Sequence, residues 1–488
     1  MIRCLLTLLV LCLATPVWAR EQAPDFVLTG QIVGGDHQTY KPVSFDLPDG
    51  VTRLTVAFDY TGRDQKTVID LGLMDPHRFR GWSGGNKRTF TLGVEDATMS
   101  YLPGPLPAGR WTLLLGVPNT RAETVASFEA RIFLERTPGG PSLAAKPLKT
   151  GAGWYRGDLH AHTGHSDGSC ETQSGARAPC PVYRTADAAT ARGLDFIAIT
   201  DHNTTSHFAA MAQLQPAFDR LLLIPGREVT TFHGHANVFG PTAFIDFRLG
   251  DAAVPNVRTL QSLAEGAGGF LSINHPTAPS GEACMGCGWT APDTDYSRVG
   301  AIEVANGGSE RAQGGAEGPL LGVAFWEAQL NAGHRITAIG GSDNHDAGLS
   351  SDIASSIGRP TTVVHAPELS TTGLLAGLRA GRVFIDFDGS RDRLLDLSAR
   401  TARSTATMGG ALAARRGETV IFTATVAGAD QARLEIVQDG EKRAPVFTRP
   451  GVFSIRMGDR PSWVRVNLRD TDGRLLAIGN PVYLSPAP

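Results

Sequence analysis

Histidines are concentrated in one stretch of the chain: residues 160–365 hold all but two of the thirteen. Within it, the triplet His160-Ala161-His162 places two imidazoles two residues apart, and Asp343-Asn344-His345 repeats that spacing with a carboxylate and an imidazole. On a β-strand, residues i and i+2 project from the same face about 6–7 Å apart, so each pair could converge on one ion. The two triplets therefore predict a metal centre.

Further residues extend this pattern, because each follows a short apolar run typical of a strand or lies in the loop after one: Asp167, His202, Glu228, His235 and His275. All these side chains offer nitrogen or oxygen, a donor set that favours zinc, manganese or iron over copper(I). We therefore expect two or three divalent ions and no organic cofactor. His233, two residues before His235, is an alternative ligand.

The elements that must position these residues lie in a middle region, residues 151–390, where short apolar runs alternate with helix-like stretches. The predicted helices are 185–192, 208–221, 257–265, 320–332 and 371–380, and the predicted strands are 158–160, 196–199, 221–224, 270–273, 301–304, 336–339 and 383–385. In an α/β barrel the C-terminal strand ends meet around one cavity. The pattern predicts a barrel of about seven strands with the metal centre at its mouth.

Both flanking regions show apolar residues at alternate positions, separated by Gly, Pro and Asp, as half-buried strands do. Residues 20–136 are predicted to form a β-sandwich, residues 137–150 a linker rich in Pro and Gly, and residues 391–488 a small C-terminal β domain. Neither flank gathers histidines and acids into a motif. We expect both to be packing or ligand-presenting modules.

The first nineteen residues are predicted to be a signal peptide, with Arg3, an apolar core from Leu5 to Leu13, and cleavage after Ala19. An uncleaved anchor is the alternative, but the apolar run is shorter than the ~20 residues that span a bilayer. The protein is therefore expected to be periplasmic or secreted. In that oxidising setting, two disulfides are favoured over a four-cysteine zinc site, with the pairing left open among Cys170, Cys180, Cys284 and Cys287.

The net charge of −3 gives no reason to expect binding to nucleic acid. Nothing in the sequence indicates membrane binding of the mature chain, and the oligomeric state is left open. The expected partner is a small-molecule substrate.

The candidate ligands, with their neighbours, resemble the motifs of the polymerase and histidinol phosphatase (PHP) superfamily over residues 150–390. The matching segments are Asp158-Leu159-His160-Ala161-His162, Ser166-Asp167-Gly168, Ile199-Thr200-Asp201-His202, Glu228, Gly234-His235, Asn274-His275-Pro276 and Ser342-Asp343-Asn344-His345. Looser features resemble the CehA/McbA branch, named for a carbaryl hydrolase: the export signal, the flanking β domains, and the segments 81–85 and 358–362.

The resemblance implies a distorted (β/α)7 PHP-type barrel with three metal positions. One would be held by His160, His162 and Asp343, a second by Asp167, His202 and His345, and a third by His235 and His275, with Glu228 bridging the first and third. The amidohydrolases also begin with HxH, but they commonly bridge two ions with a carboxylated lysine. No lysine lies between Lys149 and Lys442, so a carboxylate must serve as the bridge here.

A divalent ion can lower the pKa of a bound water from ~15.7 to about 7, which supplies a hydroxide nucleophile. Three such ions would carry more positive charge than the three carboxylates neutralise, so a phosphoester substrate is favoured. Carbamate or carboxylester hydrolysis of the carbaryl-hydrolase type is the alternative, and a non-catalytic metal-containing binding protein is a second.

Several residues near the candidate ligands have expected roles of their own. Besides Glu228, the histidines His202 and His207 are candidate catalytic residues, as proton donors to the leaving group. Arg227 and Arg359 could clamp an anionic substrate. Asp201 is expected to orient an imidazole.

Overall fold

The computed structural model describes residues 23–137, 143, 146–282, 284–443 and 451–487. The predicted signal peptide lies outside the described residues. The chain divides into two compact units, Met1–Thr137 and Pro138–Pro488. Within the described ranges, no helix is both long and apolar enough to cross a membrane.

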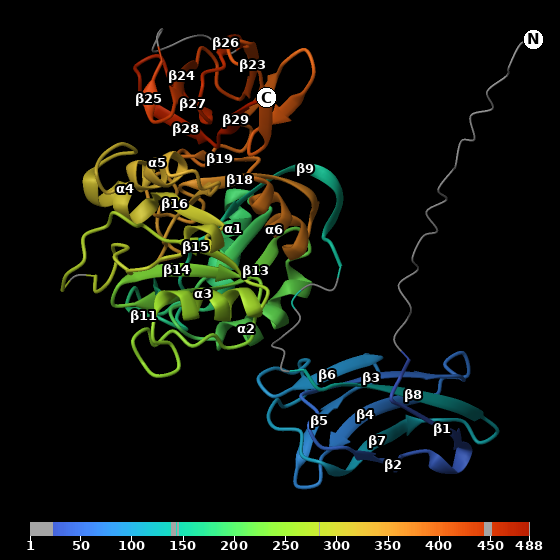
Figure 1. The fold of residues 1–488 in the computed structure, drawn as a ribbon. Helices are drawn as coiled ribbons and strands as arrows, with labels where there is room; N and C mark the ends of the chain where they lie inside the picture. Colours follow the sequence, from blue (N-terminus) through green and yellow to red (C-terminus); the bar gives the residue numbers. More distant parts are fainter. Residues whose placement is uncertain (1–22, 138–142, 144–145, 283, 444–450, 488) are drawn as a thin grey trace, which may run out of the picture. The chain divides into compact units, whose positions relative to one another are not determined.

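The first unit consists of two four-stranded antiparallel sheets, with strand orders β1-β8-β3-β6 and β2-β7-β4-β5 (Figure 1). Burial alternates strictly along much of β8, as expected for a strand with one face on a core and one in solvent. Side chains from both sheets form one apolar cluster around Trp111. The strands are Phe26–Val33 (β1), Thr39–Leu47 (β2), Arg53–Tyr60 (β3), Val68–Met74 (β4), Phe79–Ser83 (β5), Thr89–Gly93 (β6), Gly109–Asn119 (β7) and Val125–Glu135 (β8).

The second unit is a mixed α/β structure built on one large sheet, in the order β17-β16-β15-β14-β13-β12-β9-β18-β19-β28-β27-β24-β25. Its first strands are Lys149–Asp158 (β9), Phe196–Ile199 (β12), Leu222–Thr231 (β13), Gly234–Phe239 (β14), Phe270–Ile273 (β15), Ala301–Asn306 (β16), Thr337–Gly341 (β17), Thr361–Leu369 (β18) and Val383–Asp386 (β19). The helices are Val182–Arg192 (α1), His207–Leu214 (α2), Val257–Gly266 (α3), Gly307–Gln313 (α4), Val323–Asn331 (α5) and Thr371–Ala380 (α6).

The expected (β/α)7 barrel is not confirmed, because the unit is richer in strands than that fold. β13 and β14 form an antiparallel hairpin across a two-residue turn, and β15 is antiparallel to β14, so an additional strand, β14, lies between two expected strands, while the expected helix 257–265 is present as α3. Regular pairing does not join β17 to β9. Just beyond both strands, however, Asp343 N donates to His160 O and His162 N to Asn344 O, each at 2.8 Å. The two triplets therefore lie side by side.

The expected boundary at residue 390 also differs from the structure. β19 pairs with β28 (Leu475–Gly479), so the large sheet continues into the C-terminal region through β27 (Ser462–Arg469), β24 (Arg433–Gln438) and β25 (Glu441–Lys442). β22 (Ala411–Ala414) and β29 (Val482–Pro486) attach to it, and β20 (Leu394–Arg400), β21 (Thr405–Thr407), β23 (Thr419–Ala427) and β26 (Val452–Arg456) form a separate sheet. The C-terminal β region and the α/β region thus form one unit.

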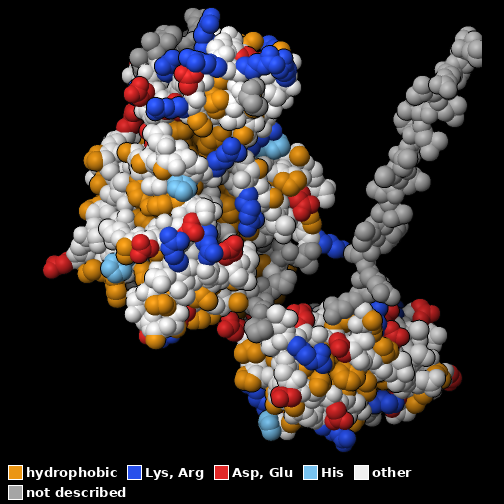
Figure 2. All heavy atoms as spheres, viewed as in Figure 1, with side chains coloured by type: hydrophobic (Ala, Val, Ile, Leu, Met, Phe, Trp, Pro, Cys, Tyr) orange, Lys and Arg blue, Asp and Glu red, His pale blue; other side chains and the backbone are white. Residues whose placement is uncertain are grey.

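Both expected cysteine pairs are present in the second unit. Cys170 and Cys180 are joined at the hairpin of β10 (Ser169–Glu171) and β11 (Arg177–Pro179), with Cα atoms 4.8 Å apart. Cys284 and Cys287 close a short loop, with Cα atoms 5.6 Å apart. These pairs indicate an oxidising compartment. Acidic and basic side chains are interspersed on the visible face of each unit, in line with the small net charge (Figure 2).

Candidate metal centre

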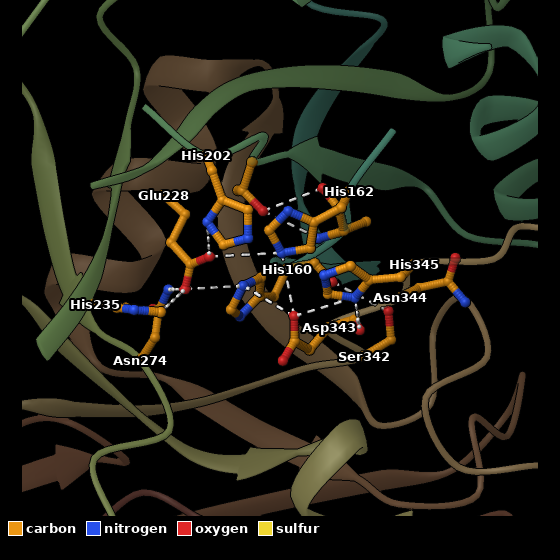
Figure 3. A network of polar contacts seen from close by, with 12 residues as sticks. His160, His162, His202, Glu228, His235, Asn274, Ser342, Asp343, Asn344 and His345 are labelled. Atoms are coloured by element: carbon orange, nitrogen blue, oxygen red, sulfur yellow. Dashed lines mark hydrogen bonds and ion pairs between the residues drawn. The ribbon is translucent and has the colours of Figure 1, made fainter. Parts of the chain in front are cut away.

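The two triplets converge at the ends of β9 and β17. Nε2 of His160 and Nε2 of His162 lie 3.3 and 3.1 Å from the same oxygen, Oδ1 of Asp343. Figure 3 shows these side chains pointing toward one another from different strands. Since both imidazoles are almost completely buried, the triplets form one shared polar cluster inside the protein.

Glu228 occupies the middle of this cluster. It lies within β13, is 1% exposed, and has carboxylate oxygens 2.9–3.4 Å from nitrogens of four histidines, which are His160, His202, His235 and His275. These histidines come from the regions of β9, β12, β14 and β15. A single carboxylate therefore connects four segments, a position that suits a bridge between ions.

A second, more open group lies at the solvent side. The carboxylate of Asp167 lies 3.4 Å from His345 Nε2, 3.6 Å from His202 Nε2 and 3.9 Å from His162 Nδ1. Its side chain is 56% exposed, whereas Glu228 is buried. This end of the cluster is therefore the one that solutes can reach.

Most of these histidines are held by partners outside the cluster. Nδ1 of His275 donates to Cys287 O and Nε2 of His235 donates to Met285 O, both at 3.1 Å, while Nδ1 of His345 donates to Asp343 O at 2.9 Å. Because a carbonyl only accepts, each of these nitrogens carries a proton, and the other ring nitrogen faces the carboxylates, where it is available to an ion once any proton on it is lost. Metal-ligating histidines show this arrangement.

Glu303 is a functional residue that the sequence reasoning missed. This carboxylate, 2% exposed on β16, accepts from His160 Nδ1 at 2.9 Å and from the backbone N–H of His275 at 3.0 Å. Gly341 leaves room for it, since a Cβ there would meet His160 Cβ at 2.4 Å and Glu303 Oε1 at 2.6 Å. A charge inside the apolar run 301–305 was the available signal, because buried charges need partners.

Two candidate ligands have strained backbones. His275 and Asp343 have φ angles of 25° and 52°, which are uncommon for residues other than glycine. Such conformations persist only where the surrounding structure enforces them, and they cluster at functional sites. The strain supports a role for both residues beyond packing.

The protonation states follow from mutual contacts within the cluster. Burial opposes ionisation of Glu228 and Asp343, but facing histidines, His160 foremost, outweigh it and hold the pKa of each carboxyl well below its usual range. Burial likewise opposes protonation of His202 and His345, yet hydrogen bonds with carboxylates, that of Asp167 first, raise the pKa of His202 to about 10 and that of His345 to about 9. In the metal-free protein, protonated histidines paired with these carboxylates therefore stabilise the cluster.

The side chains present fit a group of divalent ions. Among the described residues, His160 Nε2 and His162 Nδ1 are buried without a hydrogen-bond partner, as expected of nitrogens reserved for metal. Potential ligand atoms lie within 4.8 Å of one another in the groups His162–Asp167–His202–His345, His160–His275–Asp343, His160–His162–Glu228 and His235–His275–Cys287. Relative to the expected grouping, His162 also joins the outer group and His275 also faces the first.

Other predicted site residues lie elsewhere. His207 is fully buried on α2, where its Nε2 donates to Gly226 O at 2.9 Å. Arg227 is the neighbour of Glu228 on β13, so the two side chains point to opposite faces of the strand. Arg227 donates to Ala243 O, and its guanidinium lies over the Phe208 ring. Arg359 is partly buried in the loop before β18, where its backbone pairs with Ser355 and Ser356. His235 faces Glu228, whereas His233 is exposed.

Asp201 has a different role from the one expected. Its carboxylate accepts hydrogen bonds from the backbone and hydroxyl of Thr163, both at 2.7 Å, and from the Ser166 hydroxyl at 2.7 Å. These contacts fix the turn that carries Asp167. Asp201 therefore positions a carboxylate of the outer group, and its closest imidazole is that of His207, at 3.7 Å.

Two of the solved structures that resemble this chain are bacterial, and no family model or curated protein matches it. One is a two-domain protein of Bacteroides vulgatus containing a predicted PHP-like metal-dependent phosphoesterase, 19% identical over 72% of this chain and 100% of that one, with a TM-score of 0.34. The other is a candidate metal-dependent phosphoesterase of Bifidobacterium adolescentis, 16% identical over 41% and 91%, with a TM-score of 0.27. At these values neither likeness assigns an activity to this chain.

Proposed function

We propose that this protein is a metal-dependent hydrolase of ester bonds, of the PHP type, with phosphoesters as the favoured substrates. One observation carries the proposal: buried and half-buried imidazoles and carboxylates from separate strands converge, with a ring nitrogen of each histidine turned toward the carboxylates. The residues that would hold the ions are His160, His162, Asp167, His202, Glu228, His235, His275, Asp343 and His345. A cluster made only for stability would not leave His160 Nε2 beside two carboxylates without hydrogen-bond geometry to either.

When bound, divalent ions supply Lewis acidity and a water that ionises near neutral pH. The chain supplies the rest. Glu228 contacts the inner histidines, Glu303 fixes His160 and the backbone of His275, and Asp201 fixes the turn before Asp167. Since Asp167 and His345 are the most exposed ligands, substrate approaches from their side. Because a ring nitrogen bound to an ion carries no proton, His202 can act as a proton donor there only while it is not a ligand.

The charge of the site favours an anionic substrate. Four carboxylates, those of Asp167, Glu228, Glu303 and Asp343, would face six positive charges if three divalent ions filled the centre. The excess positive charge stabilises the developing negative charge on a phosphoryl group more than it stabilises a neutral ester.

A second candidate, hydrolysis of carbamates or carboxylesters, is favoured by an apolar rim. Phe232, in the turn between β13 and β14, is 79% exposed, and Met285, whose carbonyl holds His235, is 59% exposed. The backbones of these two segments touch, since a Cβ on Gly286 would meet Thr231 O at 2.1 Å. Two exposed apolar side chains beside the cluster suit an apolar leaving group.

The deciding experiment is hydrolysis by the purified protein of p-nitrophenyl phosphate and of a naphthyl methylcarbamate, together with measurement of bound metal. We expect bound divalent metal and faster turnover of the phosphate. His162→Asn should abolish turnover and reduce bound metal, while the matched control His334→Asn, a surface histidine beside Tyr296, should change neither. Bound metal without turnover of any ester would instead support a binding protein.

A further inference from the structure

The loop closed by Cys284 and Cys287 is the wall of the inner end of the metal centre. Its two backbone carbonyls, of Met285 and Cys287, accept the hydrogen bonds that orient His235 and His275. The loop is anchored on both sides: Gly281 and Cys284 exchange backbone hydrogen bonds at 3.1 Å, and Gly286 N donates to Ser280 Oγ at 2.9 Å. The disulfide therefore sits directly behind two candidate ligands.

The sulfur of Cys287 is itself close to those ligands. Sγ of Cys287 lies within 4.8 Å of a ring nitrogen of His235 and of His275, and Cys287 is 6% exposed. A tetrahedral zinc ion bonded to nitrogen at about 2.1 Å and to sulfur at about 2.3 Å holds its ligands roughly 3.5–4 Å apart. If Sγ of Cys287 moved by on the order of 1 Å toward the two histidines, the three atoms would have the spacing of zinc ligands. Opening of the disulfide would give the loop the freedom for that movement.

We propose that Cys287 is a latent metal ligand, masked by its disulfide with Cys284 and released by a thiol reductant to form a His235–His275–Cys287 site. The proposal rests on the proposed metal centre and adds a redox control to it. In the oxidised protein, His235 and His275 serve the centre together with Glu228. In the reduced protein, a soft thiolate joins them and shifts the preference of this position toward zinc.

The chemistry balances with a dithiol as the reductant. Its thiolate attacks Sγ of Cys284, the more exposed of the two residues, so the S–S bond breaks and Cys287 leaves as a thiolate beside the two histidines. The second thiol of the reductant then attacks the mixed disulfide, which releases Cys284 as a thiol and the reductant as a cyclic disulfide. Two electrons pass to the protein, and Cys287 binds the metal in its deprotonated form.

Cobalt(II) reports the new bond, because a cobalt–thiolate bond gives an intense near-ultraviolet charge-transfer band that nitrogen and oxygen ligands do not give. The full-length protein, loaded with cobalt, should lack this band when oxidised and gain it after dithiol treatment. Cys284→Ser should show the band without reductant. Cys287→Ser, the matched variant that also loses the disulfide, should show no band with or without reductant, even though the Cys170–Cys180 pair is still present to be reduced.

A second measurement needs no variant. After reduction of the wild-type protein, zinc should slow alkylation of Cys287 by iodoacetamide at least severalfold relative to Cys284, as read by peptide mass spectrometry. The inference is overturned if Cys287→Ser keeps the cobalt band, or if Cys284→Ser and the reduced wild type both lack it. Cobalt binding and ester hydrolysis without the band would overturn this inference alone, whereas no cobalt binding in any form would overturn the proposed function as well.

Discussion

One carboxylate, that of Glu303, couples two candidate ligands from different strands: Oε1 accepts from His160 Nδ1 at 2.9 Å and Oε2 accepts from the backbone N–H of His275 at 3.0 Å. Oε2 also accepts from the Asn306 side chain at 3.0 Å. Glu303 thus receives hydrogen bonds on both oxygens, and among these partners only His160 Nδ1 could accept one in return, in the tautomer that protonates Nε2 and so removes that nitrogen as a ligand.

Glu303→Gln is expected to weaken metal binding by about 10- to 100-fold, the usual cost of removing a residue that orients a metal-binding histidine. The glutamine amide offers one acceptor oxygen only, so its NH2 group must face either His160 or the donors at His275 and Asn306. Competition with a metal-binding dye measures the affinity. Glu265→Gln, at an exposed position on α3, is the control, and equal affinities for the two variants would contradict this role of Glu303.

His207 is expected to act in folding rather than as the proton donor. Burial lowers its pKa to about 4, so it is neutral at pH 7, and its Nε2 donates to a buried carbonyl instead of facing the ligand cluster. His207→Gln should lower the free energy of unfolding by about 1–3 kcal/mol. It should not change the dependence of kcat on pH. Urea unfolding and a kcat profile between pH 5 and 9 test this, and loss of the basic limb of that profile would restore His207 as a candidate acid.

Metal binding should become tighter as the pH rises. In the metal-free protein the pKa of His202 is raised to about 10 and that of His345 to about 9, so both are protonated at pH 7 and must lose those protons to bind an ion. Calorimetric titration at pH 7 in buffers of different ionisation enthalpy should show protons released on binding. A proton count of zero would contradict the assignment of these two histidines as ligands.

The same shifts predict how the metal-free protein responds to pH. Because the folded pKa values of His202 and His345 lie above the unfolded value of about 6.5, their stabilising contribution is complete below that pH and is lost as the pH rises through about 9 and 10. With a chelator present, Tm should fall between pH 7 and pH 10 by more than it falls for the metal-loaded protein. A Tm that falls equally in both states would contradict this.

Residue type and spacing were enough to predict which side chains meet. The HxH and DxH triplets indicated two close pairs of ligands, although both lie just beyond the ends of β9 and β17 instead of on a strand face, and a bridge between Ala161 and Asn344 brings them together. The predicted helix 371–380 also coincides with α6, because Ser370 caps its start and Gly381, in the left-handed region, ends it.

The other features of the fold and the site depend on contacts between segments far apart in the chain, which a single sequence does not reveal. Glu228 and His235 were expected beyond strand ends, but they lie inside the β13–β14 hairpin, where burial on both faces removes the alternation that marks a strand. The pairing of β19 with β28 joins residues about ninety positions apart, so nothing local signalled that the C-terminal strands extend the central sheet. Glu303 was hidden for the same reason: its partners come from β9 and β15.

Glu310, near the start of α4, is a buried carboxyl close to the metal centre but is not a candidate ligand. It allows the stability of this part of the fold to be tested separately from metal binding. It is 7% exposed, its Oε2 has no hydrogen-bond partner among the described residues, and burial, only partly offset by Arg359, raises its pKa to about 7. The helix that carries it begins after Asn306, which donates to both Glu303 and Asp343. Ionised Glu310 is therefore a destabilising charge close to the centre.

Since the folded pKa of Glu310 lies above its unfolded value of 4.5, the folded state binds the extra proton, and stability is lost as the pH rises from about 4.5 through 7. Glu310→Gln mimics the protonated form at every pH. Relative to wild type, its free energy of unfolding should therefore increase by on the order of 2 kcal/mol between pH 5 and pH 8. Urea unfolding at both pH values, with Glu265→Gln as the control, measures the difference; a gap between Glu310→Gln and wild type that stays constant with pH would show that Glu310 is already ionised in the folded protein at pH 5.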